Sequence, residues 1–229
     1  MRTFSLGPAE VIWTGTAEGD LGHRPSRLPH DDTCCDGAAR ARRDAVLPGP
    51  WVRVHQVHGD GVVVARSPDD SGATGDAVVT VAHGLPIAIA TADCGPIALA
   101  SAEGVVGAVH AGWPGLEAGV IGRAVAVMRS LGATDVVAAL GPCIHAECYE
   151  FDEERVDAFV GRWGTAVRAV SASGASAFDV PAAVAAEVAA AGADLVHVDE
   201  RCTGCSGTHF SYRSTGTPER QVMLVRRLR

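Results

Sequence analysis

The alternation of apolar and polar positions predicts a series of short, largely buried strands. β-branched and apolar runs bounded by Gly, Pro or Asp are typical of strands. Such runs lie at 51–58, 61–67, 76–84, 85–101, 104–113, 135–141 and 221–228. The run at 85–101 reads as two strands separated by a break at Gly95-Pro96, since glycine and proline interrupt regular structure.

Apolar residues change to helical spacing from Leu116 to Leu131, and Gly132 then supplies a C-terminal stop. Further helices are expected at 152–162 and 180–191. The stretch from Gly19 to Arg43 is first polar and rich in Pro and Gly, which predicts a loop entering a short helix. Helices mixed with apolar strands predict an α/β layered fold with buried sheets, formed as one domain over residues 1–229.

Composition narrows the class of protein. The 229 residues are 47% hydrophobic, enough to bury a sizeable core. A formal net charge of −8 argues against a general nucleic-acid binder, which needs clustered basic residues. No apolar run reaches about 18 residues and the N-terminus lacks an apolar signal core, so we expect a cytoplasmic protein that does not enter membranes. Its seven cysteines are then expected to be thiols or metal ligands.

Three chemistry-bearing residues lie at strand ends or breaks, each followed closely by glycine: His58, Cys94 and His110. Strand ends are where open α/β sheets place their sites. Two imidazoles and a thiolate would leave a fourth position open on a zinc ion, as catalytic sites do, and zinc lowers the pKa of a bound water to about 7. On the pattern alone, however, a small core cysteine and two strand-end histidines are the favoured interpretation.

The same residues allow a site without metal. Cys94 would be a nucleophile and His110 its base. Asp93 could orient a partner or pair with a backbone donor.

Two weaker patterns lie nearer the C-terminus. The segments "HAEC" (145–148) and "CTGC" (202–205) imitate the zinc nucleobase deaminase signature, but Arg201 stands where that signature has proline. A lone pair of cysteines two residues apart more often marks a turn with buried thiols or a minor metal site. In "FSYRSTG" (210–216), Arg213, with Arg220 nearby, could clamp an anion or stack on a base. No glycine-rich phosphate loop of the two common types is present in the sequence.

Taken together, the motifs resemble one family. They are "QVHG", "DAVVT", "TADCGPIAL", "AVHAGW", "LGPCI…CYEF", "CTGC" and "FSYR". In this order, from about residue 50 to the end, they are similar to the YfiH or laccase-domain family. That family is also called multicopper polyphenol oxidoreductase, purine nucleoside phosphorylase or peptidoglycan editing factor.

The resemblance implies a layered α/β/β/α sandwich with mixed sheets, like that of YfiH-type cysteine hydrolases. It implies a zinc or copper site at His58, Cys94 and His110, which would also be the catalytic residues. It further implies phosphorolysis of adenosine, inosine and methylthioadenosine, and deamination of adenosine. Purine nucleosides and phosphate are thus the expected partners, and we expect Gln56, Asp93 and Arg213 to contact substrate. Whether the protein is a monomer or a homodimer stays open.

The chain departs from the family where the family carries arginines. Pro114 replaces the Arg of "HAGWRG", Thr16 stands at or near the Arg of the N-terminal motif, and Ser214 replaces the second Arg after "FSYR". These losses remove cations from the expected anion side, which weakens the expectation of phosphorolysis more than that of metal binding. Three alternatives follow: a metal-independent cysteine hydrolase acting on peptidoglycan precursors, a single-copper polyphenol oxidoreductase, and a binding protein without enzymatic activity.

Overall fold

Two mixed sheets form the centre of the molecule. The computed structural model describes residues 1–22 and 37–228. One sheet has the order β12-β9-β7-β8-β5-β4, with bounds Asp194–Val198, Val136–Leu140, Gly95–Ser101, Val106–Ala111, Ala77–Thr80 and Val62–Ala65. The other has the order β1-β2-β13-β6-β3, with bounds Arg2–Leu6, Ala9–Trp13, Gln221–Arg227, Ile87–Thr91 and Val52–Arg53. Both sheets contain parallel and antiparallel pairs.

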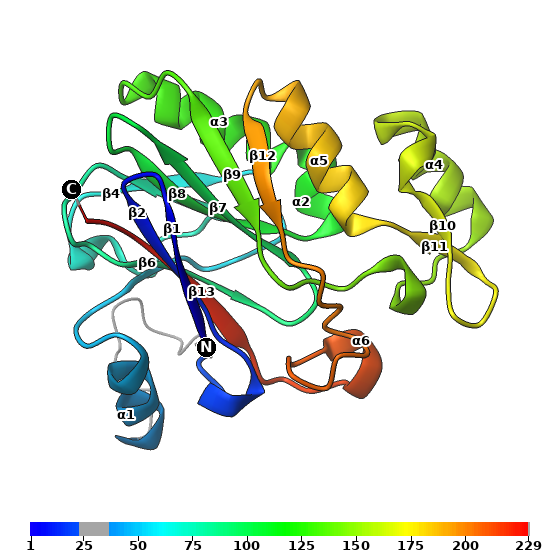
Figure 1. The fold of residues 1–229 in the computed structure, drawn as a ribbon, viewed down its shortest axis with the longest axis horizontal. Helices are drawn as coiled ribbons and strands as arrows, with labels where there is room; N and C mark the ends of the chain where they lie inside the picture. Colours follow the sequence, from blue (N-terminus) through cyan, green and yellow to red (C-terminus); the bar gives the residue numbers. More distant parts are fainter. Residues whose placement is uncertain (23–36, 229) are drawn as a thin grey trace.

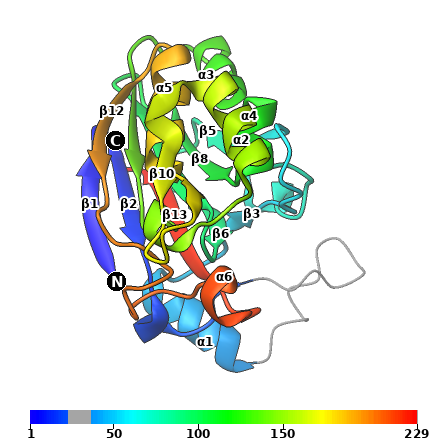
Figure 2. The same ribbon diagram turned by 90° about the vertical axis from the view of Figure 1, so that its right-hand side faces the viewer.

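Helices complete the outer layers on both sides (Figures 1 and 2). The six-stranded sheet is covered by α2, α3 and α5, with bounds Trp113–Ala118, Val120–Ser130 and Val180–Ala190, and α4 (Glu153–Trp163) packs beside α5. The outer face of the five-stranded sheet packs against the end of α1 (Gly37–Val46) and the adjoining Leu47 and Trp51. A small hairpin, β10 (Arg168–Val170) and β11 (Ser176–Phe178), and the short helix α6 (Tyr212–Thr215) are appended. This arrangement confirms the expected α/β/β/α sandwich.

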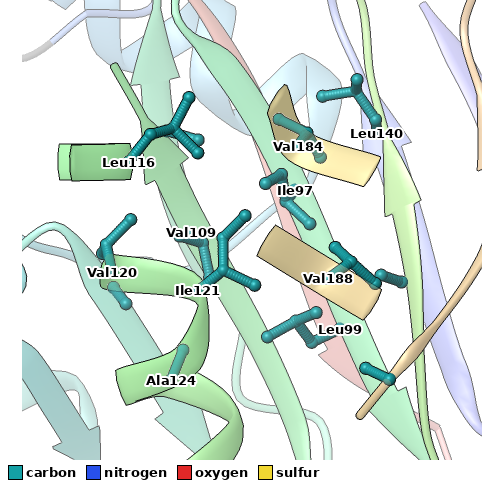
Figure 3. Packing of buried hydrophobic residues seen from close by; sticks show 14 of the residues in the cluster. Ile97, Leu99, Val109, Leu116, Val120, Ile121, Ala124, Leu140, Val184 and Val188 are labelled. Carbon is teal, nitrogen blue, oxygen red and sulfur yellow. The ribbon is translucent and has the colours of Figure 1, made fainter. Parts of the chain in front are cut away.

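Strand β7 explains why the sequence around Cys94 is so apolar. Ile97 and Leu99 face the helical layer, whereas Ala98 and Ala100 face the five-stranded sheet, and all four are fully buried. A strand buried on both faces must be apolar at every position rather than at alternate ones. Figure 3 shows the helical side of this core, where Leu116, Val120 and Ile121 of α2 and α3 pack over β7 and β8. Cys94 lies directly before β7 and His110 lies near the end of β8, so both are carried by these buried strands.

Most predicted elements are present, with three corrections to their bounds. The helix predicted from Leu116 is two helices, because Gly119 adopts a left-handed conformation (φ 83°) between α2 and α3. The run at 51–58 is a strand only at β3, and beyond it forms a single bridge at His55. The break within 85–101 falls at 92–94, just before Gly95 begins β7.

Other elements were not predicted, and part of one prediction lies outside the described residues. The N-terminal hairpin β1–β2, the edge strand β12 and the hairpin β10–β11 had no clear pattern in the sequence. Of the loop and helix predicted over 19–43, the helix is present as α1, while positions 23–36 lie outside the described residues. Among the described helices, none combines the length and the apolar character needed to span a membrane.

Candidate active site

His58, Cys94 and His110 converge at one end of the sandwich. His58 lies in the loop after β3, Cys94 lies directly before β7, and His110 lies near the end of β8. One ligand atom from each residue lies within 4.8 Å of those of the other two. Cys94 Sγ is 3.8 Å from His58 Nε2, and the two imidazole rings meet edge to face with centroids 4.7 Å apart. The fold therefore brings together three residues that spacing alone could not connect.

Asp76, which sequence reasoning missed, fixes two of these residues. It is fully buried directly before β5, and its Oδ1 lies 2.8 Å from His110 Nδ1. Its carboxylate also accepts backbone N–H bonds from Val57, His58 and Gly59 at 3.1, 2.9 and 2.7 Å. Burial alone would raise the pKa of Asp76, but hydrogen bonds from His110 and the backbone hold it below its ordinary value. A buried polar residue opening the apolar run "DAVVT" was the available signal.

The Asp76 contact sets the orientation of His110. A carboxylate only accepts hydrogen bonds, so His110 Nδ1 carries the proton and donates it. The other ring nitrogen, Nε2, is then free to act as a ligand or to interact with the Cys94 sulfur. Carboxylates behind a histidine play this role in many metal sites, where they fix the tautomer and raise ligand basicity.

Backbone strain is concentrated at the same place. Among the described residues, two non-glycine residues have positive φ: His58 at 60° and Asp93 at 102°. Such conformations cost energy and persist only where the surroundings enforce them, often at functional sites. The bonds to Asp76 hold the His58 loop, and those to Asp93 described below hold the turn that carries Cys94.

Gly112 leaves the room that the cluster needs. A Cβ atom at this position would lie 2.7 Å from His58 Cδ2 and 3.1 Å from Cys94 Sγ. Its φ of −76° is accessible to any residue, so the requirement for glycine is one of space and not of conformation. The "HAGW" motif thus carries both His110 and the gap beside it.

Charge in the cluster favours a thiolate next to an imidazolium. Burial would raise the pKa of Cys94, but the neighbouring His110 and His58 lower it from 9.0 to about 6. Burial would lower the pKa of His110, but Cys94 and Asp76 raise it from 6.5 to about 9. The two shifts describe one coupled pair. Near neutral pH the metal-free site is therefore a thiolate–imidazolium pair; the thiolate is suited to nucleophilic attack, and a metal ion that binds here would displace the proton from His110 Nε2.

A cavity of about 640 Å³ opens over the cluster. Aromatic rings of Trp113, Tyr149 and Tyr212 contribute to its lining, as do Pro114 and Leu21. Its volume is in the range of small-molecule sites. The cavity also contains three arginines, Arg53, Arg213 and Arg220.

Arg213, predicted to contact substrate, lines the cavity, and its position is fixed on several sides. Its backbone N–H donates to Asp93 Oδ2 at 2.7 Å. Its guanidinium lies over the Tyr149 ring at 4.6 Å and donates to the backbone carbonyl of Glu150. Arg220 donates to the carbonyls of Thr217 and Glu219. In the described part of the chain neither arginine forms an ion pair with a carboxylate, so both charges can serve an anionic ligand.

Asp93 and Gln56 line the cavity, but both are engaged by the protein. Asp93 is buried and accepts from Thr203 Oγ1 as well as from the Arg213 backbone, both at 2.7 Å. It therefore braces the loop carrying Cys94. The Gln56 amide donates to the Ala90 carbonyl at 2.8 Å and accepts from the Ala90 N–H at 3.0 Å. One N–H and one lone pair of Gln56 are left for a base.

The three positions that lack arginine differ in their relation to the cavity. Pro114 lies in its lining, so the missing cation there is a real loss at the site. Thr16 and Ser214 are not among the lining residues. Arg53 and Arg220 bring cations into the cavity from other elements. The sequence predicted a loss of positive charge where an anion would bind. That loss is present at Pro114, but arginines from other elements supply positive charge to the same cavity.

The deaminase-like pattern is not assembled. Cys202 and Cys205 lie close to Cys148, and the ligand atoms of these three residues are within 4.8 Å of one another. The side chain of His145 is not part of this group; its contact with it is a backbone N–H donated to Cys202 Sγ at 3.3 Å. The signature needs histidine and two cysteines on one ion, and here three thiols gather instead.

Comparison with known proteins places the chain among relatives of one kind. The family model described as "Multi-copper polyphenol oxidoreductase laccase" matches residues 33–227. A purine nucleoside phosphorylase of Streptomyces griseus is 41% identical over 203 residues, covering 83% of this chain and 80% of that protein. One of Mycobacterium tuberculosis is 36% identical over 206 residues, covering 85% and 80%.

Two solved structures share the fold over nearly the whole chain. Neisseria meningitidis protein NMB0706 has a TM-score of 0.79 at 25% identity and covers 98% of both chains. YlmD from Geobacillus stearothermophilus has a TM-score of 0.76 at 27% identity, with 96% of this chain and 92% of that chain covered.

Proposed function

The chain belongs to the multi-copper polyphenol oxidoreductase laccase family, and from its site we propose that it is a purine nucleoside phosphorylase. The observation that carries the proposal is one cavity that combines the His58–Cys94–His110 group with aromatic rings and three arginines. The relatives named as purine nucleoside phosphorylases support it. Adenosine, inosine and methylthioadenosine are the proposed substrates.

Aromatic and polar groups of the cavity suit a nucleoside. Trp113, Tyr149 and Tyr212 offer ring faces on which a purine can stack. The remaining N–H and lone pair of the Gln56 amide can bond to the base edge. These contacts would orient the base and hold the ribose near the arginines.

The arginines can bind phosphate, which is the second substrate of a phosphorylase. Guanidinium groups bind phosphate through paired, charge-assisted hydrogen bonds, and Arg213 is the best-positioned of the three because its backbone and its ring contacts fix it. In phosphorolysis a phosphate oxygen forms a bond to ribose C1′ while the bond from C1′ to the purine nitrogen breaks. The purine leaves with that electron pair and takes up a proton, and ribose 1-phosphate remains.

The donor set fits a metal ion, and we propose that His58, Cys94 and His110 hold zinc. Two imidazoles and a thiolate match zinc chemistry, and three protein ligands leave one position open. Asp76 orients His110 as a ligand, and Gly112 leaves space beside the sulfur. When bound, the ion would act as a Lewis acid and lower the pKa of a water molecule to about 7. Adenosine deamination is a second reaction that such a site could support.

Incubating adenosine with and without phosphate separates these reactions. Adenine that forms only with phosphate supports phosphorolysis, and inosine that forms in both samples supports deamination. Arg213→Gln should raise the phosphate KM, whereas Arg129→Gln should not, because Arg129 donates to carbonyls at Ala191 and Gly192 and is not among the lining residues. Absence of adenine in the wild type would contradict the proposal.

The Cys94–His110 pair favours a metal-independent cysteine hydrolase acting on peptidoglycan precursors as the second candidate function. A thiolate with a pKa of about 6 is a competent nucleophile. This candidate predicts activity that survives chelators and is destroyed by alkylation of Cys94. Loss of activity on chelation, with recovery on adding zinc, would decide against it.

A further inference from the structure

A group of three cysteines, separate from the His58–Cys94–His110 group, lies beside the wall of the cavity. Cys148 ends the short 3-10 turn Ala146–Cys148, while Cys202 and Cys205 lie in the turn that follows β12. Their three sulfur atoms are within 4.8 Å of one another. Cys202 is buried, Cys148 is partly buried and Cys205 is exposed, so an ion could reach the group from solvent.

The backbone around the three cysteines leaves space for them and donates a hydrogen bond to one of them. A Cβ atom at Gly204 would lie 2.7 Å from Cys148 Cβ and 3.0 Å from Cys148 Sγ, so only glycine lets the two segments meet. The N–H of His145 donates to Cys202 Sγ at 3.3 Å. N–H donors of this kind stabilise metal-bound thiolates.

The three sulfurs cannot all be charged without a compensating cation. Cys202 is buried and the three sulfur atoms lie within 4.8 Å of one another, so three thiolates here would repel each other and would be poorly solvated. A thiophilic divalent cation removes this penalty, because it binds the thiolates as their protons pass to solvent.

We propose that Cys148, Cys202 and Cys205 form a second metal site, which takes zinc. With zinc–sulfur distances of about 2.3 Å in a tetrahedron, sulfur atoms lie roughly 3.8 Å apart, so the observed group needs only a small contraction. Glu147 stands beside it, with Oε1 3.7 Å from Cys205 Sγ. That carboxylate, or a water, completes the fourth position.

The role of this site is structural, because it braces the wall of the cavity. Thr203, between two of the ligands, donates to Asp93 in the loop that carries Cys94. Ser214 Oγ donates to the carbonyl of Gly204 at 2.8 Å, which connects the site to the segment that carries Arg213. Tyr149, next to Cys148, lines the cavity. Zinc here would fix the positions of the Cys94 loop, the Arg213 segment and Tyr149 relative to one another.

Cobalt substitution of the full chain in a Cys94→Ala background tests the site. That variant has no thiolate in the His58–His110 cluster, so the part of the sulfur-to-cobalt charge-transfer absorption in the near ultraviolet that depends on Cys205 reports the second site. Titration of reduced, metal-free protein should give this absorption with one equivalent of Co²⁺, and added Zn²⁺ should abolish it. Zn²⁺ should also raise the Tm of the Cys94→Ala protein.

Adding Cys205→Ser, an exposed substitution that should leave the fold intact by circular dichroism, should remove both the absorption and most of the Tm rise. Cys143→Ala is the matched control, since Cys143 is a buried thiol outside the group, and it should keep both signals. Absence of thiolate absorption in folded, reduced Cys94→Ala protein would overturn the proposal. That result would leave the His58–Cys94–His110 site untouched.

Discussion

The Nδ1 atom of His110 lies 2.8 Å from a carboxylate oxygen of Asp76, and both side chains are buried. The same carboxylate accepts three backbone N–H bonds from the loop that carries His58. Asp76 therefore positions two of the three candidate ligands without contacting the ion itself. Its contribution is testable apart from that of the ligands.

We expect Asp76→Asn to weaken zinc binding and the fold together. The asparagine amide cannot accept all four hydrogen bonds, and its NH₂ group opposes the Nδ1–H of His110. Metal affinity should fall about 10–100-fold, as is usual for such outer contacts. The free energy of unfolding should fall by about 2–4 kcal/mol, because buried bonds to a charge are lost. Chelator competition and urea unfolding measure the two effects; unchanged zinc affinity would contradict the assigned role.

The Cys94 thiol of metal-free protein should react with iodoacetamide with a midpoint near pH 6. Its pKa is lowered to about 6 because His110, with a pKa raised to about 9, stays protonated beside it. Reactivity should therefore be high from about pH 6 upward and fall as acid protonates the thiolate. Mass spectrometry of the Cys94 peptide gives the rate. His110→Gln should move the midpoint up toward 9.0; a midpoint near 9 in the wild type would refute the ion pair.

Gly112→Ala should disrupt the metal site while leaving the fold nearly as stable. The new methyl group would lie 2.7 Å from the His58 ring and must push it away from Cys94. Zinc affinity should drop about tenfold or more, with little change in Tm of the metal-free protein. Gly122→Ala is the control, because a Cβ atom there meets nothing within 4 Å and helix propensity is improved. Equal zinc affinity in both variants would argue against the steric account.

Pro114→Arg should improve phosphate use. Position 114 lines the cavity, so the substitution adds a cation near Arg213 and Arg220 in the same lining. We expect a phosphate KM lower by about fivefold, equivalent to about 1 kcal/mol. Pro114→Gln, of similar length but uncharged, should not reproduce the effect. An unchanged phosphate KM in Pro114→Arg would show that this wall of the cavity does not face phosphate.

Most of the buried strands and helices could be predicted from the sequence, because the spacing and type of apolar residues depend directly on which positions are buried. The strands 62–65, 77–80 and 106–111, and the helices after 152 and 180, follow from local pattern. The edge strand β12 did not, because its alternating half-buried residues give only a weak apolar signal.

The candidate site could be predicted only as far as residue type and strand ends allow. Predicted strand ends and breaks drew attention to His58, Cys94 and His110, but the resemblance to a known family was needed to propose them as a site, and His58 in fact lies in the loop after β3. Asp76 was missed because its partners come from two other segments, and Asp93 received a vague role because its contact with Thr203 spans 110 positions. Long-range polar pairing leaves no periodic trace in a sequence.

Phosphorolysis of purine nucleosides in this cavity is expected to depend on His58, Cys94 and His110. Phosphorus NMR of adenosine incubated with phosphate and zinc-loaded protein tests it most directly, with Cys94→Ala protein in parallel. We expect ribose 1-phosphate in amounts equal to the adenine released by the wild type, and none from Cys94→Ala. Absence of ribose 1-phosphate from wild-type protein, or equal amounts from both proteins, would contradict it.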